Sequence, residues 1–256
     1  MLLDLTDQKS LKPIDERQQT NLNKFLVLLG KWNKTRNLVS RKTSIQDLNH
    51  HVIDCLALNK ELNCKKLLDV GSGAGFPGVV TAISNPQMEI TLLDSNLKKV
   101  SFLNHVKAEL QLKNIKVIHN RIEDFDLSKE DWIVSRAFSS PEELINKIKE
   151  KAPRDLVFLM MVSKNIKPSI LGYDVDYIES SAANILKKNR GFLKISLSKN
   201  LYSLKIDYFS CCKSKRRRRK DNHRFKSCRF SIGSIEERIV GGSRFTKEFY
   251  IWLRHN

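Results

Sequence analysis

The sequence predicts an α/β fold in which a parallel, doubly wound sheet follows a helical extension at the N-terminus. Within residues 13–62 the apolar positions recur every three or four residues, which is the spacing of a buried helix face. From residue 66 onward, short apolar runs alternate with longer amphipathic segments, as strands and helices alternate in such a sheet. A glycine-rich stretch, LLDVGSGAGFPG at residues 67–78, joins the first expected strand of this region to its first expected helix.

Each element is predicted from its local pattern. The helical extension divides in two, with its second part at residues 45–62. Helices are also expected at 77–84, opened by Pro77, and at 96–112 and 140–152. Strands are expected at 66–70, 88–94, 115–120, 131–138 and 155–162, and two late strands at 174–180 and 192–198.

The charge of the chain is uneven. Its 46 Lys and Arg residues exceed its 28 Asp and Glu residues by 18, which predicts attraction to a polyanion such as RNA, DNA or an anionic membrane. Residues 201–256 hold 15 basic and 5 acidic residues and show no clean period. We therefore divide the chain into a helical cap (1–62), a ligand-binding α/β domain (63–200) and a basic tail (201–256) that we expect to be poorly ordered. Both an RNA-binding arm and a non-native extension of the reading frame fit that tail.

Composition also bears on the compartment and on metals. No apolar run approaches the roughly 18 residues of a membrane span, and the first residues lack the basic start of a secretory leader. We therefore expect a cytoplasmic protein, with no membrane partner. The five cysteines have no paired spacing, which predicts reduced thiols. Because Cys211, Cys212, His223 and Cys228 match zinc spacing poorly, no metal is expected.

The glycine-rich stretch predicts a nucleotide-type binding site. Gly71, Gly73 and Gly75 follow a strand that ends in Asp69, so backbone N–H groups meet a ligand without an intervening Cβ. The pattern satisfies both the GxGxxG of dinucleotide sites and the tighter GxGxG of methyltransferases. Asp69 favours the second, because a carboxylate repels a pyrophosphate and suits the positively charged methionine end of S-adenosylmethionine.

Two further residues bear on the ligand. Pro77 removes an N–H that a pyrophosphate at this helix start would use, which again favours S-adenosylmethionine over NAD. Asp94 ends the second expected strand, 19 residues after Gly75, where a carboxylate accepts both ribose hydroxyls of either ligand. The position of Asp94 therefore supports a nucleoside ligand without choosing between the two.

Several blocks of the sequence, in the same order, resemble one bacterial family. The chain is similar over about residues 15–200 to RsmG (GidB), the 16S rRNA guanine-N7 methyltransferases. The resemblance implies a class I (Rossmann-like) fold, S-adenosyl-L-methionine as cofactor, 16S rRNA or the small ribosomal subunit as partner, and guanine 527 as the methylated base. The matching blocks are LLGKWNKTRNLVS, HHVIDC, LLDVGSGAGFPG, TLLDSNLKKVSFL, NIKVIHNRIEDF and IVSRAFSS.

The resemblance also implies roles for individual residues. The cofactor would be held by the loop from Gly71 to Gly78, with Phe76 in an apolar slot and Asp94 on the ribose. Ile122 and Glu123 would flank the adenine. Arg136 would be the arginine of the catalytic site, since a guanidinium suits a phosphate or the acceptor edge of a purine. These segments all lie at expected carboxyl ends of strands, where open α/β sheets bind ligands.

The chain departs from the family in several places. His50 stands where the family has an arginine, and Cys55 where it has a serine. Val162 and Ser163 replace the lysine and glycine that close an apolar strand in the family, with Lys164 displaced, although the strand itself is expected to form. The family also lacks the basic tail. Histidines in HHVIDC are expected to make structural polar contacts rather than to act as acid or base.

Guanine N7 has an in-plane lone pair and carries no proton, so its methylation requires no general base. Catalysis is then mostly the positioning of N7 in line with the sulfonium methyl group, in a site that excludes water. A monomer is expected. Two other hypotheses remain open from the sequence, an NAD-dependent oxidoreductase and a non-catalytic basic RNA-binding protein that retains a degenerate cofactor pocket.

Overall fold

The computed structural model describes residue 11, residues 13–136, 140–163 and 167–198, and the backbone of residues 229–232 and 235–238. By its internal contacts the chain divides into two compact units, Met1–Leu201 and Tyr202–Asn256. The first unit contains the seven-stranded sheet.

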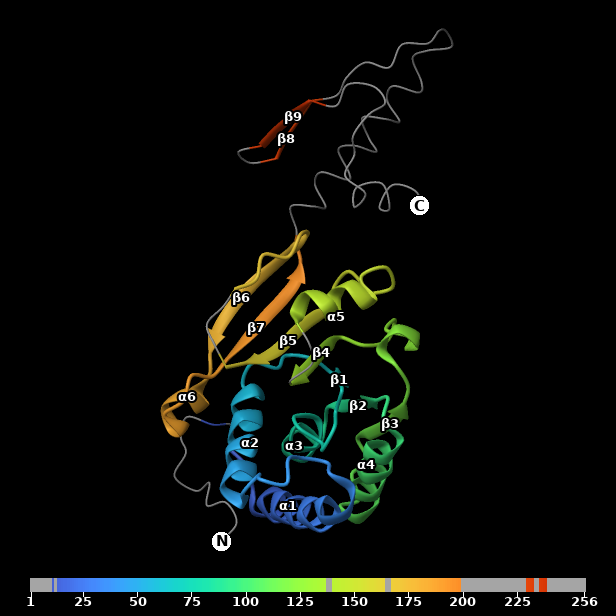
Figure 1. Ribbon diagram of the computed structural model, residues 1–256, viewed down its shortest axis with the longest axis vertical. Helices are drawn as coiled ribbons and strands as arrows, with labels where there is room; N and C mark the ends of the chain where they lie inside the picture. Colours follow the sequence, from blue (N-terminus) through green and yellow to red (C-terminus); the bar gives the residue numbers. More distant parts are fainter. Residues whose placement is uncertain are drawn as a thin grey trace. The chain divides into compact units, whose positions relative to one another are not determined.

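Seven strands of the first unit form one sheet in the order β3-β2-β1-β4-β5-β7-β6 (Figure 1). Strands β1 to β5 are parallel, as expected. The prediction of a parallel sheet is wrong for β7, which runs antiparallel to both of its neighbours, β5 and β6. A parallel return from β6 to β7 needs a crossover of a dozen or more residues, and the connection between these strands, residues 180–190, is shorter than that. The strands are β1 (Lys66–Val70), β2 (Glu89–Asp94), β3 (Ile115–His119), β4 (Trp132–Arg136), β5 (Val157–Val162), β6 (Tyr173–Glu179) and β7 (Gly191–Leu197).

The helices of this unit match the expected segments, with small shifts at their ends. The second helix ends at Leu58 rather than at residue 62, and the third begins at Gly78, with Pro77 as its N-cap. The six-residue α6 is not predicted from the sequence, because so short a segment shows no helical period. The helices are α1 (Glu16–Arg36), α2 (Ile45–Leu58), α3 (Gly78–Ser84), α4 (Leu97–Glu109), α5 (Pro141–Ile148) and α6 (Ser181–Leu186), with a 3₁₀ turn η1 (Ile122–Asp124).

Polar residues at the starts of α1 and α2 define where the helical extension begins. Each helix opens with a reciprocal capping box, in which the N-cap side chain and the side chain three residues later bind each other's backbone N–H. Asp15 pairs with Gln18 in α1, and Ser44 pairs with Asp47 in α2. The two helices therefore start at fixed residues.

The core lies on both faces of the sheet. Successive strand residues point to opposite faces, so Leu67 packs with the cluster that includes α1 to α4, whereas Leu68 packs with the cluster that includes α5. In the same way Leu92 and Leu93 of β2 divide between the two clusters. Because α1 and α2 pack on the same face as α3, the helical extension is part of one core with the sheet.

The described backbone of the second unit is a pair of antiparallel strands, β8 (Arg229–Ile232) and β9 (Ile235–Arg238). Neither strand is predicted from the sequence, which loses its period after residue 200. The expected poor order of the tail, and the cysteines and histidine weighed as zinc ligands, lie outside the described residues. Among the helices that the structure describes, none has both the length and the apolar character needed to cross a membrane.

Candidate active site

The glycine loop lies at the carboxyl ends of β1 and β2. Gly71, Gly73 and Gly75 have φ angles of 73°, 58° and 93°, a region that L-residues rarely adopt. The N–H groups of Gly71 and Ser72 both donate to the carbonyl of Leu93, at 2.8 and 3.1 Å. Since β1 has β2 on one side and β4 on the other, this loop stands where the strand order reverses, the usual binding position in an open α/β sheet.

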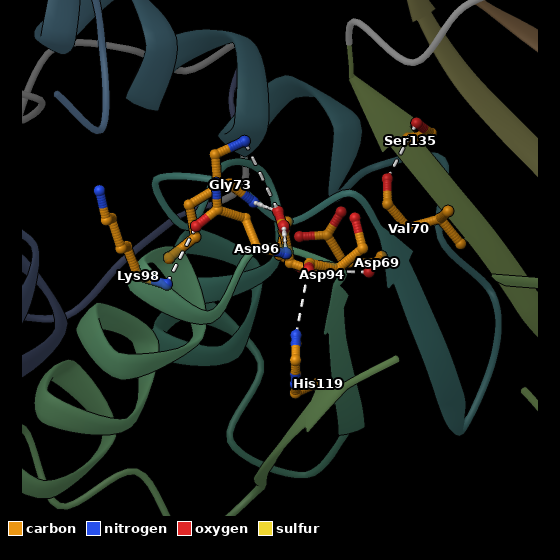
Figure 2. A network of polar contacts seen from close by, with 11 residues as sticks. Asp69, Val70, Gly73, Asp94, Asn96, Lys98, His119 and Ser135 are labelled. Atoms are coloured by element: carbon orange, nitrogen blue, oxygen red, sulfur yellow. Dashed lines mark hydrogen bonds and ion pairs between the residues drawn. The ribbon is translucent and has the colours of Figure 1, made fainter. Parts of the chain in front are cut away.

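Asp94 holds this loop in place from the end of β2. Its Oδ2 accepts from the Gly73 N–H at 2.8 Å, and its Oδ1 accepts from the Asn96 N–H at 2.8 Å (Figure 2). Lys99 approaches the same carboxylate at 3.8 Å, and the carboxylate is only 5% exposed. The side chain therefore joins the glycine loop to the start of α4, at the position where the sequence predicts a ribose-binding acid.

Asp69 lies beneath the loop rather than at its surface. Its side chain is fully buried, and its Oδ2 accepts from the Gly78 N–H at 2.9 Å. Its Oδ1 has no hydrogen-bond partner in the described part of the chain. Burial raises the pKa of Asp69 to about 7, against the opposing effects of the Gly78 N–H and the Arg136 charge. The first N–H of α3 thus donates to Asp69.

Gly78 is required by close packing, although its φ is ordinary. A Cβ at this position would lie 2.5 Å from Asp69 Oδ2 and 3.0 Å from Asp69 Cβ, and it would overlap Leu92. These atoms belong to buried side chains that are packed on all sides. The glycine therefore permits the contact between the helix start and Asp69.

Phe76 and Arg136 lie together at the other end of the loop. The Phe76 ring is 3% exposed and packs against Phe25 of α1 and His51 of α2, with ring centres 5.2 and 5.6 Å apart. The guanidinium carbon of Arg136 lies 5.0 Å from the centre of the Phe76 ring, a cation–π distance. Within the described residues no carboxylate comes within 4.0 Å of Arg136. The apolar slot around Phe76 and the predicted arginine are therefore neighbours.

His51 is poorly suited to proton transfer. Burial, with the nearby positive charge of Arg136, lowers the pKa of His51 to about 4. The ring is therefore neutral at physiological pH and packs edge-on against Phe76. This contact fits the structural role that the sequence predicts for the histidines of this helix.

Ile122 and Glu123 lie in the η1 turn that follows β3. The Ile122 side chain is 4% exposed and packs in the core cluster on the α5 side of the sheet. The Glu123 carboxylate pairs with Lys147 of α5 at 3.0 Å, while Lys151 donates to the carbonyls of Ile122 and Phe125 at 2.6 and 2.8 Å. These contacts fix the backbone of the turn beyond the end of β3 and direct both side chains toward α5.

Two residues near the carboxyl ends of β4 and β5, Asp54 and Arg190, are not predicted from the sequence. Asp54 of α2 is 5% exposed, and its Oδ2 accepts from the Arg190 Nε at 3.1 Å. Asp54 belongs to a block that resembles the family, so it carries a weak local signal. Arg190 carries none, because its partner is 136 residues away in sequence.

The departures from the family leave the strand in place. β5 runs to Val162, and Ser163 follows it, as expected. Lys164 lies outside the described residues. The cysteines at 55 and 64 are unpaired, and Cys55 is buried. No group of three metal-ligating side chains occurs in the described part of the chain.

The seven-stranded sheet, the glycine loop at its switch point and the acids at the carboxyl ends of β1 and β2, Asp69 and Asp94, define a class I (Rossmann-like) methyltransferase. The family model of GidB, rRNA small subunit methyltransferase G, matches residues 18–186. The chain belongs to this family.

Individual relatives agree with the family model. The ribosomal RNA small subunit methyltransferase G of Ruthia magnifica subsp. Calyptogena magnifica is 35% identical over 68% of this chain and 87% of its own length. The protein of the same name from Stutzerimonas stutzeri (strain A1501) is 42% identical over 61% of this chain and 73% of its own. Among solved structures, a SAM-dependent methyltransferase from Aquifex aeolicus is 17% identical, with a TM-score of 0.45 over 66% of this chain and 98% of its own.

Membership of this family confirms the predicted fold, family and enzyme class, an S-adenosylmethionine-dependent rRNA methyltransferase. It does not favour an NAD-dependent oxidoreductase or a non-catalytic RNA-binding protein. The match spans parts of both the helical cap and the α/β domain, and it ends before the basic tail.

Proposed function

We propose that this protein transfers the methyl group of S-adenosylmethionine to N7 of a guanine in 16S rRNA, the base that the family resemblance places at position 527. The observation that carries the proposal is the convergence of the glycine loop, Asp94 and Arg136 at one switch point of a sheet that belongs to this family. A cytoplasmic monomer that acts on the small ribosomal subunit or its RNA is part of the same proposal.

The cofactor would lie along the loop from Gly71 to Gly78. A carboxylate offers about four lone-pair sites, and the backbone uses one on each oxygen of Asp94, so two remain for the ribose hydroxyls. The adenine would lie against the backbone of Ile122 and Glu123. Asp69, beneath the loop, would support the methionine end by holding the Gly78 N–H at the start of α3.

Arg136 would then contact the RNA that receives the methyl group. Its contact with Phe76 orients the guanidinium without neutralising it, so the charge is free to hold an RNA phosphate or the O6 of the target base. S-adenosylmethionine, when bound, would supply an electrophilic methyl carbon to the lone pair of N7, with the carbon–sulfur bond electrons leaving on S-adenosylhomocysteine. No proton moves, which agrees with a site whose histidine, His51, is neutral and half-buried.

Methyl transfer from radiolabelled S-adenosylmethionine to small ribosomal subunits tests these roles. Arg136→Gln is expected to reduce kcat/KM at least about tenfold while cofactor affinity changes little, because a charged hydrogen bond contributes about 1.5–3 kcal/mol. Arg17→Gln is the matched control, since Arg17 is exposed near Glu109 at the far end of α4. Equal rates for wild type and Arg136→Gln would contradict the role of the arginine.

A further inference from the structure

A buried carboxylate oxygen of Asp54 lacks a partner. Asp54 is 5% exposed, and Arg190 occupies only its Oδ2, at 3.1 Å. The other oxygen, Oδ1, accepts no hydrogen bond in the described part of the chain. A buried charged oxygen without a donor is destabilising, so a donor supplied by a bound ligand would stabilise this carboxylate.

Asp54 lies near the part of the site where Arg136 would contact the target base. Arg190 immediately precedes Gly191, which pairs with Val162 at the carboxyl end of β5. Arg136 ends the neighbouring strand β4 and pairs in register with Met161. Asp54 and both arginines therefore lie near the carboxyl ends of β4 and β5. The cofactor loop lies beside them, at the carboxyl ends of β1 and β2.

Burial and nearby charge have opposing effects on the Asp54 carboxyl. Burial raises the pKa of Asp54, and the positive charges of Arg190 and Arg136 act in the opposite direction. One turn earlier in α2, His51 packs against Phe76 of the glycine loop. The end of α2 is thus held between the cofactor loop and the start of β7.

The chemistry of the reaction restricts how guanine is recognised. An arginine commonly reads guanine through O6 and N7 together, but that contact would occupy the lone pair that must attack the methyl group. The free edge of the base carries the N1–H and N2–H donors. A carboxylate, which only accepts hydrogen bonds when ionised, is the side chain that matches two donors.

We propose that Asp54 determines specificity by accepting hydrogen bonds from the N1–H and N2–H groups of the target guanine, with Arg190 as the residue that positions it. This inference rests on the proposed function, since it assumes a guanine acceptor. Adenine presents an N1 acceptor and no N2 amino group, so the same carboxylate repels it.

Asp54→Asn tests the proposal with little change in shape. The amide keeps an oxygen for Arg190 and places an NH₂ donor where the base presents its own donors. We expect kcat/KM on small ribosomal subunits to fall at least about 100-fold, with unchanged cofactor affinity and Tm. Asp176→Asn, at an exposed position of β6, is the matched control and is expected to behave as wild type. If Asp54→Asn keeps wild-type kcat/KM, or lowers only Tm, the pair merely joins α2 to β7 and the proposal is overturned.

A binding measurement separates this proposal from the proposed function. The full chain loaded with S-adenosylhomocysteine is titrated with guanosine, inosine and adenosine monophosphates, followed by NMR. We expect wild type to prefer guanosine over inosine, which lacks the N2 amino group, and inosine over adenosine. Asp54→Asn and Arg190→Met should lose this order. If wild type shows the order but transfers no methyl group, only the proposed function fails; if wild type shows no order, the recognition proposal fails.

Discussion

Replacing Gly78 by alanine is expected to destabilise the protein and weaken cofactor binding. The new methyl group would lie 2.5 Å from Asp69 Oδ2 and would overlap Leu92, and both of these side chains are completely buried. Overpacking of this kind costs about 1–3 kcal/mol. Displacement of Asp69 would also weaken its bond with the Gly78 N–H, so we expect a total loss of about 3 kcal/mol.

This loss is measurable as a shift of Tm. For a protein of this size about 1 kcal/mol corresponds to roughly 2–4 °C, so Gly78→Ala should lower Tm by about 6–12 °C in thermal unfolding followed by circular dichroism. Gly30→Ala is the control, because Gly30 is an exposed residue of α1 and an added methyl group would meet nothing within 4 Å. That change should stabilise the helix by about 0.5–1 kcal/mol. A Tm for Gly78→Ala within about 1 °C of wild type would refute the packing argument.

Three other changes probe the cofactor site and the extent of the catalytic unit. Asp94→Ala should weaken S-adenosylmethionine binding about 10- to 100-fold in calorimetry, because charge-assisted bonds to the ribose and to Gly73 are lost; an unchanged Kd would exclude Asp94 from the cofactor site. The folded-state pKa of Asp69 is raised from 3.8 to about 7, so this group contributes most stability below pH 3.8 and loses it as pH rises toward 7. Asp69→Asn, which keeps an acceptor for Gly78, should therefore flatten the unfolding free energy between about pH 5 and 7, measured by urea titration; a slope equal to that of wild type would show that Asp69 ionises normally. Truncation after Asn200 should leave methyl transfer intact, since the family match ends at residue 186, and a large loss of rate would assign the tail a role in catalysis.

Local sequence predicts those parts of the site that one short segment forms by itself. Glycines at 71, 73 and 75 are required by the positive φ of each residue, so their spacing alone indicates the loop. Asp94 follows a clear apolar strand, and parallel strands end at one edge of the sheet. The side chain therefore falls beside the loop without any knowledge of the tertiary structure.

Other features depend on contacts between distant segments. Asp69 has the right position in sequence, yet its burial and its bond to Gly78 follow from how α3 packs on β1. The Asp54–Arg190 pair joins residues 136 positions apart, and no local pattern predicts it. The reversal of β7 likewise depends on the connection from β6, residues 180–190, which is too short for a parallel crossover.

The nucleoside that receives the methyl group tests the central claim most directly. Small ribosomal subunits from cells that lack this methyltransferase are incubated with the protein and radiolabelled S-adenosylmethionine, and the 16S rRNA is digested and analysed by mass spectrometry. We predict label in 7-methylguanosine alone, at a single position. Label in another methylated nucleoside, or none despite measured cofactor binding, would contradict guanine N7 of 16S rRNA as the acceptor.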